Sequence, residues 1–205
     1  MWAPDTPPIL DRAFYARSAL QVAPDLLGCT LVRSEPNGSI CAGVIVETEA
    51  YTWDDPACHA FRGETARCRV MFGEPGNAYV YFTYGMHYCF NVVTSELGRG
   101  EAVLVRAVEP RAGEDLMLAR RVASAQRPPR MPSNFLTGGP ARLCQAFAID
   151  VAHSGLSLVG DSDIVVHYRP AGFNRPISAT ARIGISRAKD NLWRFIVTNS
   201  IYLSR

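Results

Sequence analysis

Short apolar segments separated by turn residues run along most of the chain and predict an antiparallel sheet. The longest segment, residues 40–51, is strongly β-prone, and a Pro-Asn-Gly turn at 36–38 separates it from an alternating segment at 29–33. Pro110 is expected to stop the strand that precedes it. Further strands are predicted at 78–83, 87–94, 101–108, 163–168, 178–186 and 194–198.

Helices are predicted in several of the intervals between these strands. Asp11 is suited to cap a short helix that runs to Ser18, and Gly28 is suited to end a second helical piece at 23–27. Pro140 opens a helix at a position where a missing N–H costs nothing. The remaining helical segments are expected at 65–72, 114–122 and 140–149.

The order of these elements predicts the fold class. The chain has no internal repeat and no regular alternation of strand and helix, so residues 1–205 are predicted to form a single α+β domain. Its core is expected to be a largely antiparallel, twisted β-sheet with surrounding helices and a protruding β-hairpin. Residues 1–9 are interpreted as a loose lead-in, and residues 124–137, rich in Pro, Arg and Ser, as a mobile loop.

The strand at 40–51 carries the first candidate chemistry, because side chains alternate between its two faces. The apolar face is predicted to contain Val44, Val46, Thr48 and Ala50. The opposite face is predicted to contain Ile45, Glu47, Glu49 and Tyr51. This polar face fits an active site, and it fits the solvated face of an edge strand equally well.

The hairpin predicted at 78–94 carries a second group of candidate functional residues, which are aromatic. Tyr79 and Tyr81 are predicted on one face and Phe82 on the other, and such ladders often only stabilise a sheet through cross-strand pairs. Tyr84 stands beside the Gly85 turn, where a large ring is expected to stay exposed. Protruding wedges of this kind unstack base pairs in minor-groove binders. An acid near stacking rings suits a protein that extracts a flat ring and cleaves a bond beside it.

The composition of the chain limits which classes of protein it can belong to. No apolar run is long enough to span a membrane, and the N-terminus resembles no signal peptide, so a cytoplasmic protein is expected. The six cysteines lack metal-ligand spacing and are expected to be buried, reduced thiols. Neither a metal nor a cofactor is therefore expected. Twenty of the 21 basic residues are arginine, so Lys189 is the only amine available for a Schiff base.

Five segments in order resemble those of a known family, the alkyladenine (3-methyladenine) DNA glycosylases, monofunctional base-excision repair enzymes. The segments are Val-Glu-Thr-Glu-Ala-Tyr (46–51), Tyr-Val-Tyr…Tyr-Gly-Met (79–86), Val-Leu-Val-Arg-Ala-Val-Glu-Pro (103–110), Gly-Pro…Leu-Cys-Gln-Ala (139–146) and Arg-Ile-Gly-Ile (182–185). The resemblance implies removal of damaged purines, such as 3-methyladenine, hypoxanthine or ethenoadenine, from double-stranded DNA. It leaves the preferred base open.

The resemblance also implies catalytic roles. Glu49 corresponds to the general base that activates the water attacking the sugar C1′. Arg106 and the main-chain carbonyl of Ile183 correspond to the groups that hold this water. Glu47 has no catalytic counterpart, and strand nicking through Lys189 is not expected.

The base pocket is implied in the same way. Tyr51, His59 and Tyr81 correspond to its walls, and Asn91 to a residue of its floor that bears on purine choice. Tyr84 corresponds to the residue that fills the gap left by the flipped nucleotide. The chain is one residue shorter than the family between Tyr51 and His59, which makes the register of His59 less secure than that of Glu49.

Arginines are expected to grip the DNA phosphates, and the candidates are Arg62, Arg67, Arg69 and Arg142. With a net charge of only +2, affinity for undamaged DNA is expected to be modest. A monomer without membrane partners is expected. Two other interpretations stay open at this stage: a carbohydrate glycosidase that uses Glu47 and Glu49 as its acid pair, and a non-catalytic nucleic-acid-binding module of the same fold.

Overall fold

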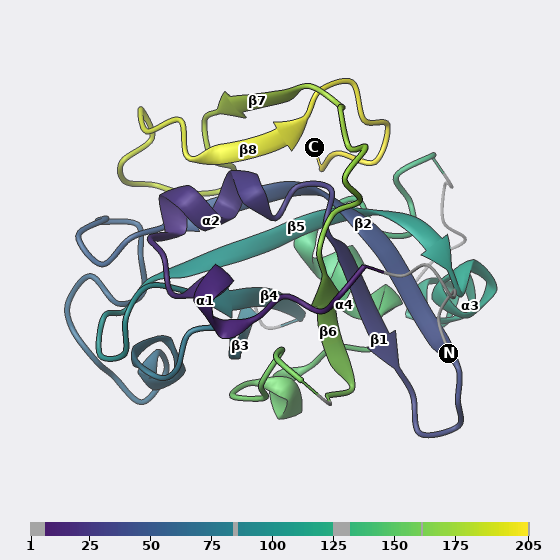
Figure 1. Ribbon diagram of the computed structural model, residues 1–205, viewed down its shortest axis with the longest axis horizontal. Helices are drawn as coiled ribbons and strands as arrows, with labels where there is room; N and C mark the ends of the chain where they lie inside the picture. Colours follow the sequence, from purple (N-terminus) through teal and green to yellow (C-terminus); the bar gives the residue numbers. More distant parts are fainter. Residues whose placement is uncertain (1–6, 84–85, 125–131, 161, 205) are drawn as a thin grey trace.

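The computed structural model describes residues 7–83, 86–124, 132–160 and 162–204 (Figure 1). Its strands are β1 (Thr30–Ser34), β2 (Ile40–Tyr51), β3 (Ala78–Thr83), β4 (His87–Val93), β5 (Ala102–Ala112), β6 (Ile164–His167), β7 (Ile177–Thr180) and β8 (Arg194–Val197). The α-helices are α1 (Arg12–Tyr15), α2 (Ala19–Asp25), α3 (Glu114–Ala123) and α4 (Pro140–Ala146), and 3₁₀ turns span Arg69–Phe72 and Val151–His153.

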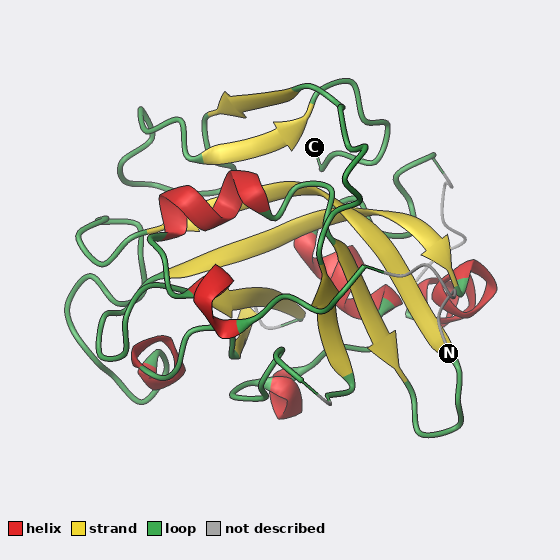
Figure 2. Ribbon diagram, viewed as in Figure 1, coloured by secondary structure: helices red, strands yellow, loops and turns green. Residues whose placement is uncertain are grey.

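All strands of the described parts join one antiparallel sheet, which confirms the predicted α+β class. The main path runs β3-β4-β5-β2-β1-β6, and β8 joins β2 and β7 outside this path. The second edge of β2 is therefore divided: its first half pairs with β1, and the stretch from Glu47 to Glu49 pairs with β8. Helices surround this sheet (Figure 2). The middle of β2 consequently lies between two neighbouring strands rather than at an edge.

The helices begin where side chains satisfy their first backbone N–H groups. Asp11 accepts a hydrogen bond from the N–H of Phe14 (2.8 Å), as predicted. Ser18 caps α2, so this helix begins four residues earlier than the predicted 23–27 piece. Gly28 follows it with φ +87°, a conformation that favours glycine. The predicted helix at 140–149 ends at Ala146.

Two strand predictions were wrong in extent. β5 continues through Pro110 to Ala112, because Pro110 lies beside Gly43 at a point where the register of β2 and β5 shifts. Proline is tolerated in a sheet at such irregularities, where its missing N–H interrupts no regular ladder. β7 ends at Thr180, so most of the predicted 178–186 strand is instead a loop.

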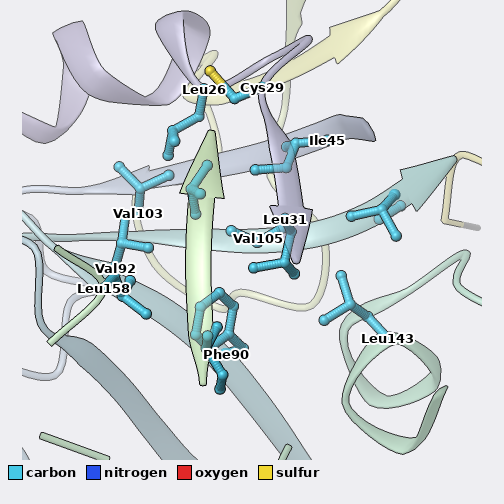
Figure 3. Packing of buried hydrophobic residues seen from close by; sticks show 14 of the residues in the cluster. Leu26, Cys29, Leu31, Ile45, Phe90, Val92, Val103, Val105, Leu143 and Leu158 are labelled. Carbon is cyan, nitrogen blue, oxygen red and sulfur yellow. The ribbon is translucent and has the colours of Figure 1, made fainter. Parts of the chain in front are cut away.

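The core is formed by the sheet and by helices packed on it. α2 packs on β2 and β5, and α4 on β4 and β5. Leu26 at the end of α2, Phe90, Val105 and Leu143 of α4 point toward one another in this core (Figure 3). Of the predicted mobile loop, residues 125–131 lie outside the described residues, whereas Thr137 is buried and its hydroxyl donates to the carbonyl of Val108 (2.6 Å).

A bulge in β2 changes which residues face the core. Ile45 pairs with Val108 and Glu47 with Ala107, so Val46 is an additional residue in β2. Ile45 and Val46 both belong to the main apolar core, whereas Val44 is only half-buried. The prediction that Ile45 shares a face with the glutamates and that Val44 faces the core was therefore wrong. The bulge reverses the alternation just before the two acidic residues.

Candidate active site

Glu49 lies at the centre of the sheet, with Leu104 of β5 on one side and Arg194 of β8 on the other. Its side chain is fully buried. Oε1 accepts a hydrogen bond from the N–H of Ile183 (2.8 Å) and lies 3.2 Å from Nη1 of Arg106. Oε2 accepts a hydrogen bond from the hydroxyl of Tyr51 (2.8 Å). Three donors from three parts of the chain thus hold one carboxylate.

A pocket of about 480 Å³ lies beside this carboxylate, next to the residues that hold it. Its volume is within the range of about 300–1,000 Å³ found for small-molecule sites. Glu49 itself is not among the lining residues, but the three residues that hold it are. The predicted site residues that line the pocket are Tyr51, His59, Tyr81, Asn91, Arg106 and Ile183. The residues that hold Glu49 and the aromatic hairpin therefore line one cavity.

The aromatic wall of the pocket is formed by β3 and the loop after β2. The rings of His59 and Tyr81 meet edge to face, with centroids 4.6 Å apart. Nδ1 of His59 lies 2.9 Å from the hydroxyl of Tyr79. Asn91 stands opposite Tyr79 in the hairpin ladder and donates from Nδ2 to its carbonyl (3.0 Å). This hydrogen bond holds the Asn91 amide in the lining of the pocket.

The pocket changes the acidity of its tyrosines and its histidine. Burial raises the pKa of Tyr51 strongly, and the neighbouring Glu49 raises it further, so the phenol remains a hydrogen-bond donor. Burial also raises the pKa of Tyr81. The pKa of His59 is lowered to about 4, first by removal of the ring from water and second by the positive charge of Arg67. His59 is consequently neutral near pH 7 although part of its surface is exposed.

The loop after β7 completes the site. Arg182 forms a buried ion pair with Asp55, in which Nη2 lies 3.0 Å from Oδ1, and it donates from Nη1 to the carbonyl of Ala50 (3.0 Å). Gly184 follows with φ +76°, a backbone geometry that a strand does not contain. This turn brings the N–H of Ile183 to Glu49. Whether the carbonyl of Ile183 holds a water molecule stays a prediction.

Sequence reasoning missed several residues of this loop and its surroundings. In the segment 182–185 only the carbonyl of Ile183 received a predicted role, and Arg182 and Asp55 received none. Arg187 lines the pocket mouth and is exposed. The only available signal for Arg182 was its place in that motif, since its partner Asp55 lies in a distant loop. No local sequence pattern predicts the contact between Arg182 and Asp55.

Glu47 is also fully buried, which excludes the solvated edge-strand interpretation. Its carboxylate accepts hydrogen bonds from Arg106 Nε (2.8 Å), Arg194 Nε (2.7 Å) and both the N–H and the hydroxyl of Ser204 (2.6 Å each). Burial alone would raise the pKa of Glu47, but Arg106, Ser204 and Arg194 outweigh it and lower this pKa. Glu47 does not line the pocket. The two glutamates therefore do not face one another across a sugar-sized cavity, which argues against a carbohydrate glycosidase.

The predicted phosphate-binding arginines have different surroundings. Arg62, Arg67 and Arg69 are exposed in the loop that precedes β3, and the guanidinium of Arg67 lies 5.5 Å from the Tyr81 ring centre. Arg69 pairs with Glu64 (3.1 Å). Arg142 donates from Nη1 to the carbonyl and the side-chain oxygen of Asn134, 3.2 Å each. Tyr84, the predicted gap-filling residue, lies outside the described residues.

Within the described ranges, three further features bear on the chemistry. No group of three or more His, Cys, Asp or Glu side chains is arranged to hold a metal ion there. All six cysteines are free and buried, as predicted. None of the helices found there has the length and apolar character needed to cross a membrane.

Comparison with known proteins adds a family relationship. A family model described as methylpurine-DNA glycosylase matches residues 13–201. A protein of Carboxydothermus hydrogenoformans, provisionally named 3-methyladenine DNA glycosylase, is 50% identical over 197 residues, which cover 96% of this chain and 99% of that protein. Similar proteins with the same provisional name occur in Francisella tularensis (45% over 196 residues; 95% and 97% covered) and Rhodopseudomonas palustris (46% over 198 residues; 97% and 92% covered).

Proposed function

Because the chain belongs to the methylpurine-DNA glycosylase family, we propose that it excises alkylated or deaminated purines from duplex DNA. Candidate substrates are 3-methyladenine, hypoxanthine and ethenoadenine. The damaged nucleotide is flipped out of the helix, and water activated by Glu49 hydrolyses the N-glycosidic bond. The observation that carries the proposal is the buried Glu49 carboxylate, held by three residues that line the pocket, Arg106, Ile183 and Tyr51.

The proposed reaction assigns one task to each group around the bond. The oxygen of a water molecule attacks the sugar C1′, and a proton of this water passes to Glu49. The bonding electrons leave with the purine, and the product is an abasic site. Positive charge develops on the sugar in the transition state, and an ionised carboxylate nearby stabilises it. Arg106, whose Nη1 lies 3.2 Å from Oε1, favours this ionised state.

The aromatic wall supports recognition of an extruded base. Flipping costs a few kcal/mol, and the cost is lowest for damaged or badly paired bases. Stacking of a base on an aromatic side chain contributes about 1–3 kcal/mol. Tyr51, His59 and Tyr81 line the pocket, so two or more such contacts can offset the flip. Asn91 lines the pocket, and we propose that it selects among damaged purines.

The DNA duplex is proposed to bind on the surface around the mouth of the pocket. The exposed guanidinium groups of Arg62, Arg67 and Arg187 suit contacts with phosphates. Arg69 and Arg142 remain candidates whose side chains must first exchange their contacts with Glu64 and Asn134. Tyr84 retains its proposed role as the wedge that replaces the flipped nucleotide in the stack.

A panel of duplexes that each carry one lesion tests this function. The wild-type protein is expected to release the free base in single-turnover assays from at least one of the three lesions. Glu49→Gln is expected to abolish release and to retain binding to the same duplex, because the amide cannot accept the proton of water. Turnover of Glu49→Gln near the wild-type rate would remove Glu49 as the base.

The same assay separates the two remaining alternatives. A non-catalytic binding module would bind lesion duplexes without any release of base. A glycosylase that also nicks DNA needs an amine nucleophile, and borohydride would trap it on the abasic product. No trapped adduct is expected. An adduct that disappears in Lys189→Ala would contradict the monofunctional mechanism.

A further inference from the structure

Glu47 is a buried carboxylate that the proposed reaction does not use. Its side chain is 0% exposed, and four hydrogen bonds reach it from Arg106, Arg194 and Ser204. Burying a charge is costly unless it is paired and hydrogen-bonded. A buried carboxylate at Glu47, so close to the proposed catalytic Glu49, therefore requires an explanation.

The reason lies in the orientation of Arg106. This residue is the additional residue of β5 at a second bulge, because Glu47 pairs with Ala107 and Thr48 pairs with Val105. Bulges redirect side chains near active sites. A bulged arginine has a long, flexible side chain, and only its contacts determine where the guanidinium points.

Glu47 and Ser204 occupy one edge of that guanidinium. Nε of Arg106 donates to Oε1 of Glu47 (2.8 Å) and lies 3.2 Å from the hydroxyl of Ser204, while Nη2 lies 3.0 Å from the same hydroxyl. The Ser204 hydroxyl in turn donates to Glu47 Oε1 (2.6 Å). These contacts direct the remaining nitrogen, Nη1, toward Oε1 of Glu49 (3.2 Å).

The charges of the group are balanced. Two carboxylates, Glu47 and Glu49, face two guanidinium groups, Arg106 and Arg194, and all four side chains are at most 13% exposed. Removal of the negative charge at Glu47 would leave two buried guanidinium groups to compete for Glu49. Arg106 would then be free to turn toward Glu49 with other nitrogens.

We propose that Glu47 and Ser204 are positioning residues, which hold the Arg106 guanidinium so that Nη1 faces Glu49 and the pocket. This inference rests on the proposed function of Glu49 and adds a role for a segment beyond residues 13–201, the part matched by the family model. Neither residue touches the substrate. Both act on the rate of bond cleavage and leave the binding of the lesion duplex unchanged.

Ser204→Ala tests the proposal with little risk to the fold, because only one hydroxyl is removed and the N–H contact to Glu47 remains. The matched control is Ser200→Ala: Ser200 lies in the same segment, is equally buried (8% exposed) and accepts a hydrogen bond from the N–H of Tyr202 instead. The measurement is the single-turnover rate against protein concentration, on the lesion duplex that the wild type cleaves fastest. It gives the maximal rate and the half-saturating concentration separately.

Ser204→Ala is expected to lower the maximal rate about tenfold, the loss typical of one hydrogen bond to a charged group. Its half-saturating concentration is expected to stay within about twofold. Ser204→Thr keeps the hydroxyl and is expected to restore the rate, and Ser200→Ala to match the wild type. Equal rates for Ser204→Ala and Ser200→Ala would overturn the proposal. So would a loss of duplex affinity that accounts for the loss of rate.

A second measurement does not depend on activity. In protein labelled with ¹⁵N at arginine, the Nε–H signal of Arg106, assigned through Arg106→Lys, is expected to exchange slowly with water. Glu47→Gln and Ser204→Ala are expected to accelerate this exchange at least tenfold relative to Ser200→Ala. Unchanged exchange in both variants would overturn the positioning role, even if the wild type released a base. If exchange were accelerated in these variants but the wild type released no base, the positioning role would stand and the proposed function would be wrong.

Discussion

The guanidinium carbon of Arg182 lies 4.7 Å from the centre of the Tyr51 ring. Tyr51 lines the pocket and Arg182 does not, so the cation covers the ring from behind. The same guanidinium carbon lies 5.0 Å from the ring centre of Trp193, and Asp55 neutralises the charge of Arg182. Cation–π contacts of this kind are strongest where water is excluded. The plane of Tyr51, the proposed stacking wall, is therefore fixed from the interior.

Asp55→Ala is expected to destabilise the protein by about 3–5 kcal/mol, because it leaves the Arg182 charge buried without its partner. Urea denaturation followed by tryptophan fluorescence measures the loss. The control is Glu74→Ala, which breaks the exposed pair with Arg12 (3.4 Å) and is expected to cost less than about 1 kcal/mol. Similar midpoints for the two variants would show that the buried pair contributes little.

Tyr51→Phe separates the two proposed roles of Tyr51, since it keeps the ring and removes the donor to Glu49 (2.8 Å). A hydrogen bond to a charged group contributes about 1.5–3 kcal/mol, so the single-turnover rate is expected to fall about ten- to hundredfold. Affinity for a lesion duplex is expected to be retained because the ring still stacks. Tyr168→Phe, outside the pocket, serves as the control. A loss of affinity without a loss of rate would contradict this division.

His59 is expected to make stability depend on pH in a defined direction. Its pKa is about 4 in the folded protein and about 6.5 in an unfolded chain, so the unfolded state binds the proton first as pH falls. The stabilising contribution is present above pH 6.5 and is lost as the pH falls toward 4. His59→Gln is therefore expected to show a smaller loss of stability between pH 7 and pH 4.5 than the wild type. Parallel curves for the two proteins would exclude a lowered pKa.

The sequence predicted those parts of the fold that local pattern determines. β2 and β3 lie where alternation and turn residues placed them, and β4 ends one residue before the end of its predicted range. The orientation of side chains along β2 was not predictable in the same way. The bulge at Val46 depends on how β2 pairs with β5. The sequence of a strand predicts which side chains alternate, but it does not predict the register in which the neighbouring strand pairs with it.

In the candidate site, too, contacts within one strand could be predicted from the sequence, and contacts between distant segments could not. Glu49 and Tyr51 are two residues apart on one strand, so their proximity could be predicted. The contacts of Glu47 with Ser204 and of Asp55 with Arg182 join residues 157 and 127 positions apart. Both depend on loops and on a terminal segment without a regular pattern. Charged residues in such segments normally face solvent, and only the folded arrangement shows that they are buried.

Arg62 offers the clearest test of the DNA-binding surface, because it is exposed and close in sequence to the pocket-lining His59. Arg62→Ala is expected to weaken binding to damaged and undamaged duplexes by the same factor, since a phosphate contact carries no information about the base. Loss of one such contact lowers the slope of log affinity against log salt concentration by about 0.9. Arg111→Ala removes the same charge at the end of β5 remote from the pocket-lining Ala102, and is expected to leave the slope unchanged. A defect of Arg62→Ala confined to the damaged duplex would assign this arginine to the base pocket instead.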